Sequence, residues 1–542
     1  MKLIISKFGK NFLTVLIFII LLLSLRSDYR FVKDINCCGD DHSYYVHSLT
    51  IVDDFDFNYD NQLEYIEGKV YEYNDKIAPR NYVGSGILAS PFMFIGKYID
   101  IFLERLNIDN SEIMPYKLFL YSLSPVFYIF FSTLLFSKLI DKSKNKFNKY
   151  LLVLIIFGNG VHYYAFERYS MTHSYEFFMV SLLIYLHYIF YTNMNIKRRN
   201  LLAFVLPFIY LVTFLVRYTN YFIFLIPFWV SKISELKKSN NRLHKNPYFL
   251  IGTFISSISY YLISLSIYGQ FIIRPQAAYG QDLSVISWAN DSFNMNNLIS
   301  KHLVNLFKIF YTQEFGIIWF IPVLVFIIFY LLRDTFVNTK NFITNTLILI
   351  SIGLPFAIVL LWETVASSFG IRYLFGVVPI SIYVLINIKN INKNIWAIRY
   401  LTVFSIFSFL SVLFFETSSL SSLSEMDQLN SFGNVTRFAQ PLYLSGVIKS
   451  FFLFDSYQII FATSFFGAIV MKIFISIFGV DGFLDILSDL GLDIINGDVL
   501  NIVNKVESID SHKFLFISLL LVFISRKLAN IIYIDNKGSF LK

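Results

Sequence analysis

The amino-acid sequence predicts an all-α protein that crosses a membrane many times. Hydrophobic residues make up 56% of its 542 positions, charged residues only 15%, and the mean hydropathy is +0.58. A water-soluble chain of this length needs far more polar surface than this composition offers. The apolar residues also gather in separate runs close to the length of about 20 residues that a spanning helix needs. Composition and patterning together therefore define a polytopic membrane protein.

The apolar runs give the expected spans in chain order. Residues 8–26 come first, and because no small-residue cleavage site follows them we expect an uncleaved span, not a signal peptide. With the shorter candidates included, we expect about 11–13 transmembrane helices. The later runs are 116–137, 150–165, 174–192, 201–216, 219–233, 248–268, 315–332, 344–362, 371–388 and 397–416.

Two regions outside these runs need a separate description. The long acidic and aromatic loop 27–115 contains an apolar run, 84–103, that glycines and a proline interrupt, so we expect interfacial helices there. The C-terminal region, 416–542, combines one or two further membrane segments with an acidic segment at 481–510. The chain therefore divides into a transmembrane module, 1–415, and this C-terminal region.

Basic residues set the orientation, because they recur in every second loop. By the positive-inside rule these loops and the N-terminus are cytoplasmic, and loop 27–115 lies outside. The same distribution accounts for the net charge of +8 without a nucleic-acid partner. Usage of Lys, Asn, Ile and Phe fits a bacterial inner membrane. The basic positions are Lys2, Lys7 and Lys10, then Lys138–149, Lys197–Arg199, Lys232–245, Arg333 with Lys340, and Lys389–Arg399.

Four outward segments hold the unusual polar residues, which places candidate chemistry on one side of the membrane. Asp40 and Asp41 are adjacent acids, and two close carboxylates repel unless one is protonated or a cation or arginine lies nearby. The other segments offer basic, hydroxyl and imidazole groups. The segments are 39–43, 79–92, 167–174 and 362–373.

These segments, taken in order, resemble the GT-C superfamily of membrane glycosyltransferases, of the mannosyltransferase and aminoarabinose-transferase kind. The resemblance covers about residues 1–415 and rests on the order of several motifs. They are the acidic pair after the first span, Asn81-Tyr82-Val83-Gly84-Ser85-Gly86 leading to Pro91-Phe92, Ser170-Met171-Thr172-His173-Ser174, Glu314-Phe315-Gly316-Ile317-Ile318-Trp319, and Phe369-Gly370-Ile371-Arg372-Tyr373.

The resemblance implies a GT-C-like bundle and a reaction. A sugar moves with inversion from a polyprenyl-phosphate carrier to a glycan, lipid or protein acceptor at the outer face. Asp40 or Asp41 is the candidate general base. Arg372 and Arg80 are the candidate groups for the donor phosphate, because a guanidinium stays charged and matches phosphate oxygens. The candidate substrate-binding residues are Tyr82, His173 and Tyr373.

Some members of the superfamily use a divalent metal held by outer-loop acids. Here the implied ligands are Asp41 or Asp40 with Glu167, with possible help from His173, and oxygen ligands of this kind suit magnesium, manganese or calcium.

Simpler interpretations stand beside each of these. The acidic pair could cap a helix, Arg372 and Arg217 could anchor the interface, and Glu167 with Arg168 could form a local ion pair. Two other functions also remain: a polymerase or ligase of lipid-linked polysaccharide, which shares the donor chemistry, and a non-catalytic transporter or flippase of lipid-linked saccharides. A transporter predicts ionisable residues in the spans and an internal repeat, and the sequence offers few of the former and no evident repeat.

Overall fold

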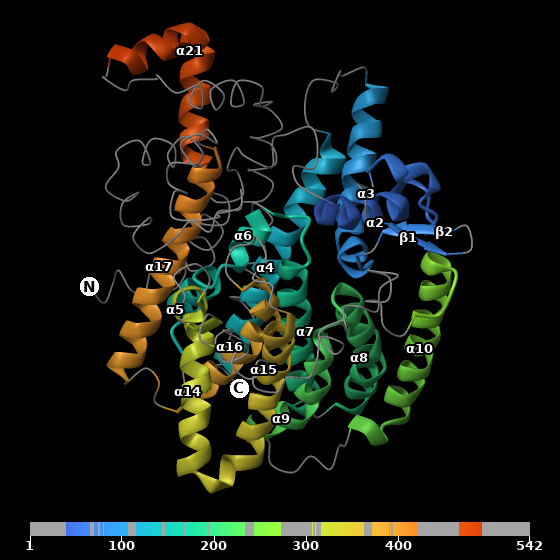
Figure 1. The fold of residues 1–542 in the computed structure, drawn as a ribbon, viewed down its shortest axis with the longest axis vertical. Coiled ribbons are helices and arrows are strands. Elements are labelled where there is room, and N and C mark those ends of the chain that lie inside the picture. The colour runs from blue at the N-terminus through green and yellow to red at the C-terminus, as the bar shows by residue number, and fades with distance from the viewer. Residues whose placement is uncertain are drawn as a thin grey trace, which may run out of the picture.

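The computed structural model of the chain is a bundle of α-helices with a small antiparallel hairpin at its edge (Figure 1). This agrees with an all-α membrane protein. The structure describes residues 39–65, 70–73, 76–79, 81–106, 115–143, 147–166, 168–192, 195–233, 243–272, 306, 309–310, 316–362, 371–389, 391, 394–420 and 465–489.

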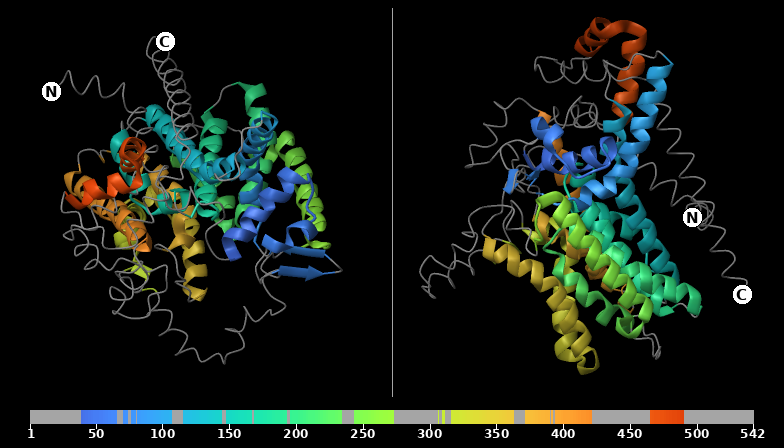
Figure 2. Two further views of the ribbon diagram at one scale, coloured as in Figure 1. Left: turned by 90° about the horizontal axis from the view of Figure 1, so that it is seen from above. Right: turned by 90° about the vertical axis from the view of Figure 1, so that its right-hand side faces the viewer.

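The described part of loop 27–115 begins with a helix that is tied to the chain after it. The ring of His47, on the helix α2, receives a hydrogen bond at Nδ1 from the Tyr59 hydroxyl and donates one from Nε2 to the Asn81 carbonyl, both at 2.7 Å. The hairpin lies beside the helix α10 (Pro247–Tyr268; Figure 2), where Lys76 Nζ donates to the Ser266 carbonyl at 2.9 Å. The elements are α2 (Gly39–Asp53), the 3-10 helix η1 (Asp60–Tyr65), β1 (Val70–Tyr73) and β2 (Lys76–Pro79).

The helices α3 (Gly84–Arg105) and α4 (Tyr116–Lys142) pack against each other as a pair. Asp100 joins them, because its carboxylate accepts the first two backbone N–H groups of α4, each at 2.8 Å. Gly96 allows the close approach, since a side-chain carbon there would lie 2.4 Å from a backbone oxygen of α4. We expected an interfacial helix at 84–103; α3 is unbroken through Pro91 and is long and apolar enough to cross a membrane.

The middle of the chain forms the larger part of the bundle. Asn148, Asn195 and Asn246 each cap a helix by accepting a backbone N–H, and all three lie in or beside the basic loops. The helices α5, α8 and α10 therefore begin at the end of the bundle that carries the basic loops, and we call the opposite end, which the sequence predicts to face outward, the outer end. The elements are α5 (Lys149–Phe157), α6 (Val161–Phe166), α7 (His173–Thr192), α8 (Ile196–Val216), η2 (Asn220–Leu225), α9 (Ile226–Ile233), η3 (Leu243–Lys245) and α10 (Pro247–Tyr268).

The second half packs its own helices against this group. The helix α16 lies at the centre, buried from Val378 to Leu385. The fully buried Trp229 of α9 donates to the Ser351 hydroxyl of α15 at 3.2 Å, which joins the two halves. The elements are α13 (Ile317–Phe320), α14 (Pro322–Val337), η6 (Thr339–Asn341), α15 (Phe342–Trp362), η7 (Arg372–Val377), α16 (Val378–Asn387), α17 (Ile395–Leu420) and α21 (Phe465–Asp489).

Several expected spans form as two consecutive helices. The run 150–165 breaks between α5 and α6, where Gly158 contacts α17 so closely that a side-chain carbon would lie 2.4 Å from Cβ of Ser405. The runs 219–233, 315–332 and 371–388 likewise become η2–α9, α13–α14 and η7–α16. Irregular backbone at membrane depth is tolerated where protein surrounds it, and these breaks are largely buried.

The number of spans is only partly defined. Five helical segments of the described chain are long and apolar enough to cross a membrane: Gly84–Arg105, Tyr116–Lys142, Ile196–Val216, Pro247–Tyr268 and Thr339–Ala357. The expected first span, 8–26, and the segments 490–510 and 513–525 lie outside the described residues. The helix α21 joins the apolar residues 465–478 to the start of the acidic segment 481–510, through a bend at Gly479 with φ of 73°.

Candidate functional site

Charged residues from distant parts of the chain meet at the outer end of the bundle. The start of α2, the turn before α7, the first turn of α7, the end of α8 and the start of η7 all contribute. We call this group the arginine cluster. Its members are Asp41, Arg168, His173, Glu176, Arg217, Arg372 and Tyr373.

Asp41 and Arg168 form a buried ion pair. Oδ2 of Asp41 accepts from Nη2 of Arg168 at 2.7 Å and from Nε at 3.0 Å, and each side chain is only 4% exposed. For the adjacent acids the sequence predicted that one is protonated or that a cation or an arginine lies nearby, and Arg168 is an arginine beside Asp41. Because both charges are removed from water, each depends on the other for compensation.

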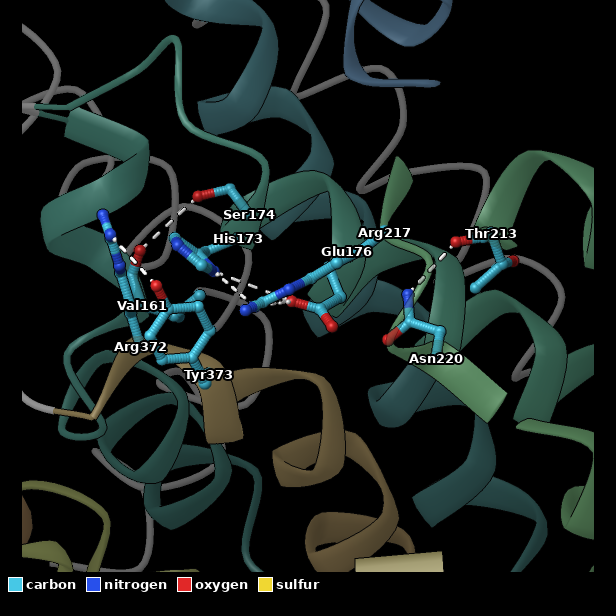
Figure 3. Close-up of polar contacts among 9 residues, drawn as sticks. All are labelled: Val161, His173, Ser174, Glu176, Thr213, Arg217, Asn220, Arg372 and Tyr373. Atoms are coloured by element: carbon cyan, nitrogen blue, oxygen red, sulfur yellow. Dashed lines mark hydrogen bonds and ion pairs between the residues drawn. The ribbon is translucent and has the colours of Figure 1, made fainter. Parts of the chain in front are cut away.

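A second buried ion pair joins α7 to the end of α8. Nη1 of Arg217 donates to Oε2 of Glu176 at 3.1 Å and lies 3.2 Å from Nδ1 of His173 (Figure 3). The helix η7 approaches this pair at Gly376, where a side-chain carbon would lie 2.5 Å from Oε1 of Glu176. The absence of a side chain at this glycine allows η7 to reach the cluster.

Tyr373 lies between two guanidinium groups. Its ring centroid is 4.5 Å from Cζ of Arg217 and 5.2 Å from Cζ of Arg372, which are cation–π distances. Nη2 of Arg372 also donates to the Tyr373 hydroxyl at 3.3 Å (Figure 3). Arg372 and Tyr373 are only half-buried, so they can meet a ligand, whereas the ion pairs behind them are buried.

The electrostatics of the cluster favour an anion. Burial, and then the charges of Arg217, Arg372 and Arg168, hold the pKa of His173 well below its ordinary value, so this imidazole is neutral at physiological pH. Burial alone would lower the pKa of Arg217, but Glu176 and the hydroxyls of Tyr373 and Tyr44 raise it above the usual value. Among its described members the cluster has three guanidinium groups and two carboxylates, and this majority of cationic groups suits an anion.

The structure brings together four of the candidate residues from the sequence: Asp41, His173, Arg372 and Tyr373. Tyr82 lies nearby, since its ring centroid is 5.1 Å from that of Tyr218, the residue after Arg217. Asp40 belongs to the first turn of α2, but its side chain is outside the described part of the chain, as are Arg80 and Glu167 altogether.

Three members of the cluster were missed or given another role. We expected Arg168 to pair with its neighbour Glu167, whereas its described partner is Asp41. Arg217 was expected as an interfacial anchor, but it is buried against Glu176. Glu176 itself was not singled out, although an acid three residues into an apolar run was an available signal.

The described side chains that could be metal ligands do not by themselves form a metal site. The oxygen Oδ2 of Asp41 faces the guanidinium of Arg168, and a divalent cation there would meet a positive charge at hydrogen-bond distance. Within the described residues, no three His, Cys, Asp or Glu side chains are grouped as metal ligands. The implied metal pair Asp41–Glu167 depends on a residue outside this part of the chain.

Comparisons with known proteins give no further identification. Neither the family models, nor the curated proteins, nor the solved structures with which the chain was compared match it. The likeness to the GT-C superfamily therefore rests on the sequence motifs alone and stays a prediction.

Proposed function

We propose that this protein is a membrane glycosyltransferase that moves a sugar from a polyprenyl-phosphate carrier to an acceptor at the outer face of a bacterial inner membrane. The observation that carries the proposal is the arginine cluster. In it Arg168, which pairs with an acid of the first outer loop, and Arg372, from a late outer loop, both act on the charge of His173. The acceptor is a glycan, a lipid or a protein.

The charges of the cluster support a phosphate-linked donor. The leaving group of such a donor is a phosphate, whose negative charge grows as the bond to the sugar breaks. Arg372 is half-buried at the start of η7, beside the ring of Tyr373. Pre-positioned positive groups aimed at developing charge are among the strongest sources of rate enhancement. The roles of Arg372 and Tyr373 are therefore to bind and orient the phosphate.

The proposed reaction needs one proton acceptor. The acceptor hydroxyl oxygen bonds to the anomeric carbon, the bond from that carbon to the phosphate oxygen breaks, and polyprenyl phosphate leaves with the electron pair. The hydroxyl proton passes to a carboxylate of the acidic pair. Arg168 keeps Asp41 ionised but also makes it a weaker base. A weak base suits an oxocarbenium-like transition state, in which the leaving group departs early.

The test uses right-side-out membrane vesicles that contain the natural acceptors and a panel of labelled polyprenyl-phosphate sugars. Arg372→Ala is expected to lower transfer by about 10²–10³-fold, the loss typical for one group that stabilises developing charge. Arg372→Lys should recover part of it, because a lysine cannot form a bidentate contact. The matched control is Arg399→Ala, which removes an exposed arginine that lies on the ring of Trp396. Full transfer by Arg372→Ala would overturn the proposal.

A further inference from the structure

A large open groove runs along the bundle away from the arginine cluster. It has a volume of about 1280 Å³ and is bounded by α8, α9, α10 and the start of α15. The helices α8 and α10 lie side by side in Figure 1. Pockets for small ligands measure about 300–1,000 Å³, so this groove accepts something larger or longer. None of the seven residues of the arginine cluster lines it.

The walls of the groove are apolar and accessible. Aromatic side chains line most of its length, and Phe224, Phe228 and Phe271 are 53%, 57% and 45% exposed. Two of the bounding helices, α8 and α10, are long and apolar enough to cross a membrane. A groove of this kind between such helices is therefore open to hydrocarbon, and a lipid chain is the occupant that its walls fit.

One end of the groove is basic. Lys232 ends α9, His244 lies in η3, and Lys340 lies in η6 just before α15, and all three line the groove. These positions belong to the loops that the positive-inside rule assigns to the cytoplasm. Among the described residues, no acidic side chain lines the groove. The charge is thus complementary to an anionic headgroup at the level of the cytoplasmic leaflet.

A hydroxyl inside the groove supplies a further polar contact. Ser256 of α10 is 6% exposed, and its Oγ makes no hydrogen bond with any described residue. Thr253 and Ser257 also line the groove but donate to carbonyls of their own helix, at 2.8 and 2.9 Å. Ser256 is therefore suited to donate to an ester carbonyl of a bound lipid, since a buried hydroxyl without a partner is costly.

We propose that this groove binds an anionic glycerophospholipid of the cytoplasmic leaflet, with its phosphate at Lys232 and Lys340 and an acyl chain along the aromatic wall. Basic pockets between transmembrane helices on the cytoplasmic side are suited to such headgroups. The proposal is independent of the proposed transfer reaction, because the residues that would hold the phosphate, Lys232 and Lys340, lie in the loops opposite the arginine cluster.

The test measures lipid binding to the detergent-purified full chain by native mass spectrometry, with dioleoyl phosphatidylglycerol or dioleoyl phosphatidylcholine added. We expect the anionic lipid to bind at least tenfold more tightly. The variant Lys232→Gln/Lys340→Gln should weaken it by about 25-fold, since each basic residue near the membrane surface contributes about fivefold. Its control, Lys197→Gln/Arg333→Gln, removes the same charge from exposed positions outside the groove.

A second pair of variants tests the apolar wall. Thr253→Trp places a large ring in the groove from an exposed position and should reduce binding, whereas Ile258→Trp, on the same helix but outside the groove, should not. Equal binding of both lipids, or equal losses in the two charge variants, would overturn the proposal. Displacement of the phosphatidylglycerol by added polyprenyl phosphate at equal concentration would also overturn it, because the groove would then belong to the donor.

Discussion

Variants of the buried ion pair Asp41–Arg168 can show whether Asp41 acts as the general base or only stabilises the fold. Asp41→Asn keeps the shape of the side chain but removes the carboxylate that pairs with the buried guanidinium of Arg168, whose side chain is 4% exposed. Removing one partner of such a pair costs about 3–5 kcal/mol. The single variant Arg168→Gln should cost a similar amount. A lost activity in either single variant is therefore ambiguous, because the fold is weakened as well.

The double variant Asp41→Asn/Arg168→Gln resolves the ambiguity. It removes both charges and leaves two amides that can hydrogen-bond to each other, so it should be more stable than either single variant. Its transfer rate should nevertheless stay low, because a positioned base contributes about 10²–10⁴-fold. The measurements are the free energy of unfolding in mixed detergent micelles and the transfer rate in vesicles.

Two results would refute this reasoning. Recovery of transfer in the double variant would show that Asp41 acts only through the fold. Unchanged stability in all three variants would show that the ion pair is not energetically significant. The half-exposed pair Asp53–Lys117, at 2.8 Å in the same outer region, is the control: Lys117→Gln should cost no more than about 1 kcal/mol.

Three further predictions follow from the packing. Burial lowers the pKa of His47 to about 4 from 6.5 in the unfolded chain, so the unfolded state binds more protons between these values. The free energy of unfolding should therefore fall by about 3 kcal/mol as the pH drops from 6.5 to 4. If the free energy of unfolding of His47→Gln depended on pH as steeply as that of the unaltered protein, this prediction would be contradicted. Gly84→Ala puts a methyl group 2.2 Å from the backbone of α8 and should lower the free energy of unfolding by about 1–3 kcal/mol, measured by thermal unfolding. The control is Gly353→Ala, which has nothing within 4 Å and should be neutral or stabilising. Glu176→Gln leaves Arg217 uncompensated and should destabilise by about 3–5 kcal/mol, and a change below 1 kcal/mol would count against the buried pair.

The sequence was sufficient to group Asp41, His173 and Arg372, because the alternation of basic loops assigns all three to one side of the membrane. It also offered an arginine near Asp41 as one of three ways to relieve the repulsion of the acidic pair, beside protonation and a cation. It did not identify Arg168 as that residue, since the pair spans 127 positions and depends on how α2 sits against the turn before α7. Local patterns favoured the neighbour Glu167 instead.

The pair Glu176–Arg217 shows the same difficulty within the bundle. Each residue borders an apolar run, and each on its own suggests an interfacial anchor. Their contact follows from the packing of α7 against α8, which hydropathy does not specify. The breaks within the expected spans 150–165 and 371–388 were missed for a related reason: a window of apolar residues has the same hydropathy whether one helix or two form it.

The lack of a side chain at Gly376 affects the geometry of the arginine cluster. If a methyl group stood there, either the Glu176 carboxylate or η7 would have to shift. A shift of the carboxylate would disturb its pair with Arg217, and a shift of η7 would move Arg372 and Tyr373. In homologous chains a larger residue at this position should therefore occur together with a shorter one in place of Glu176.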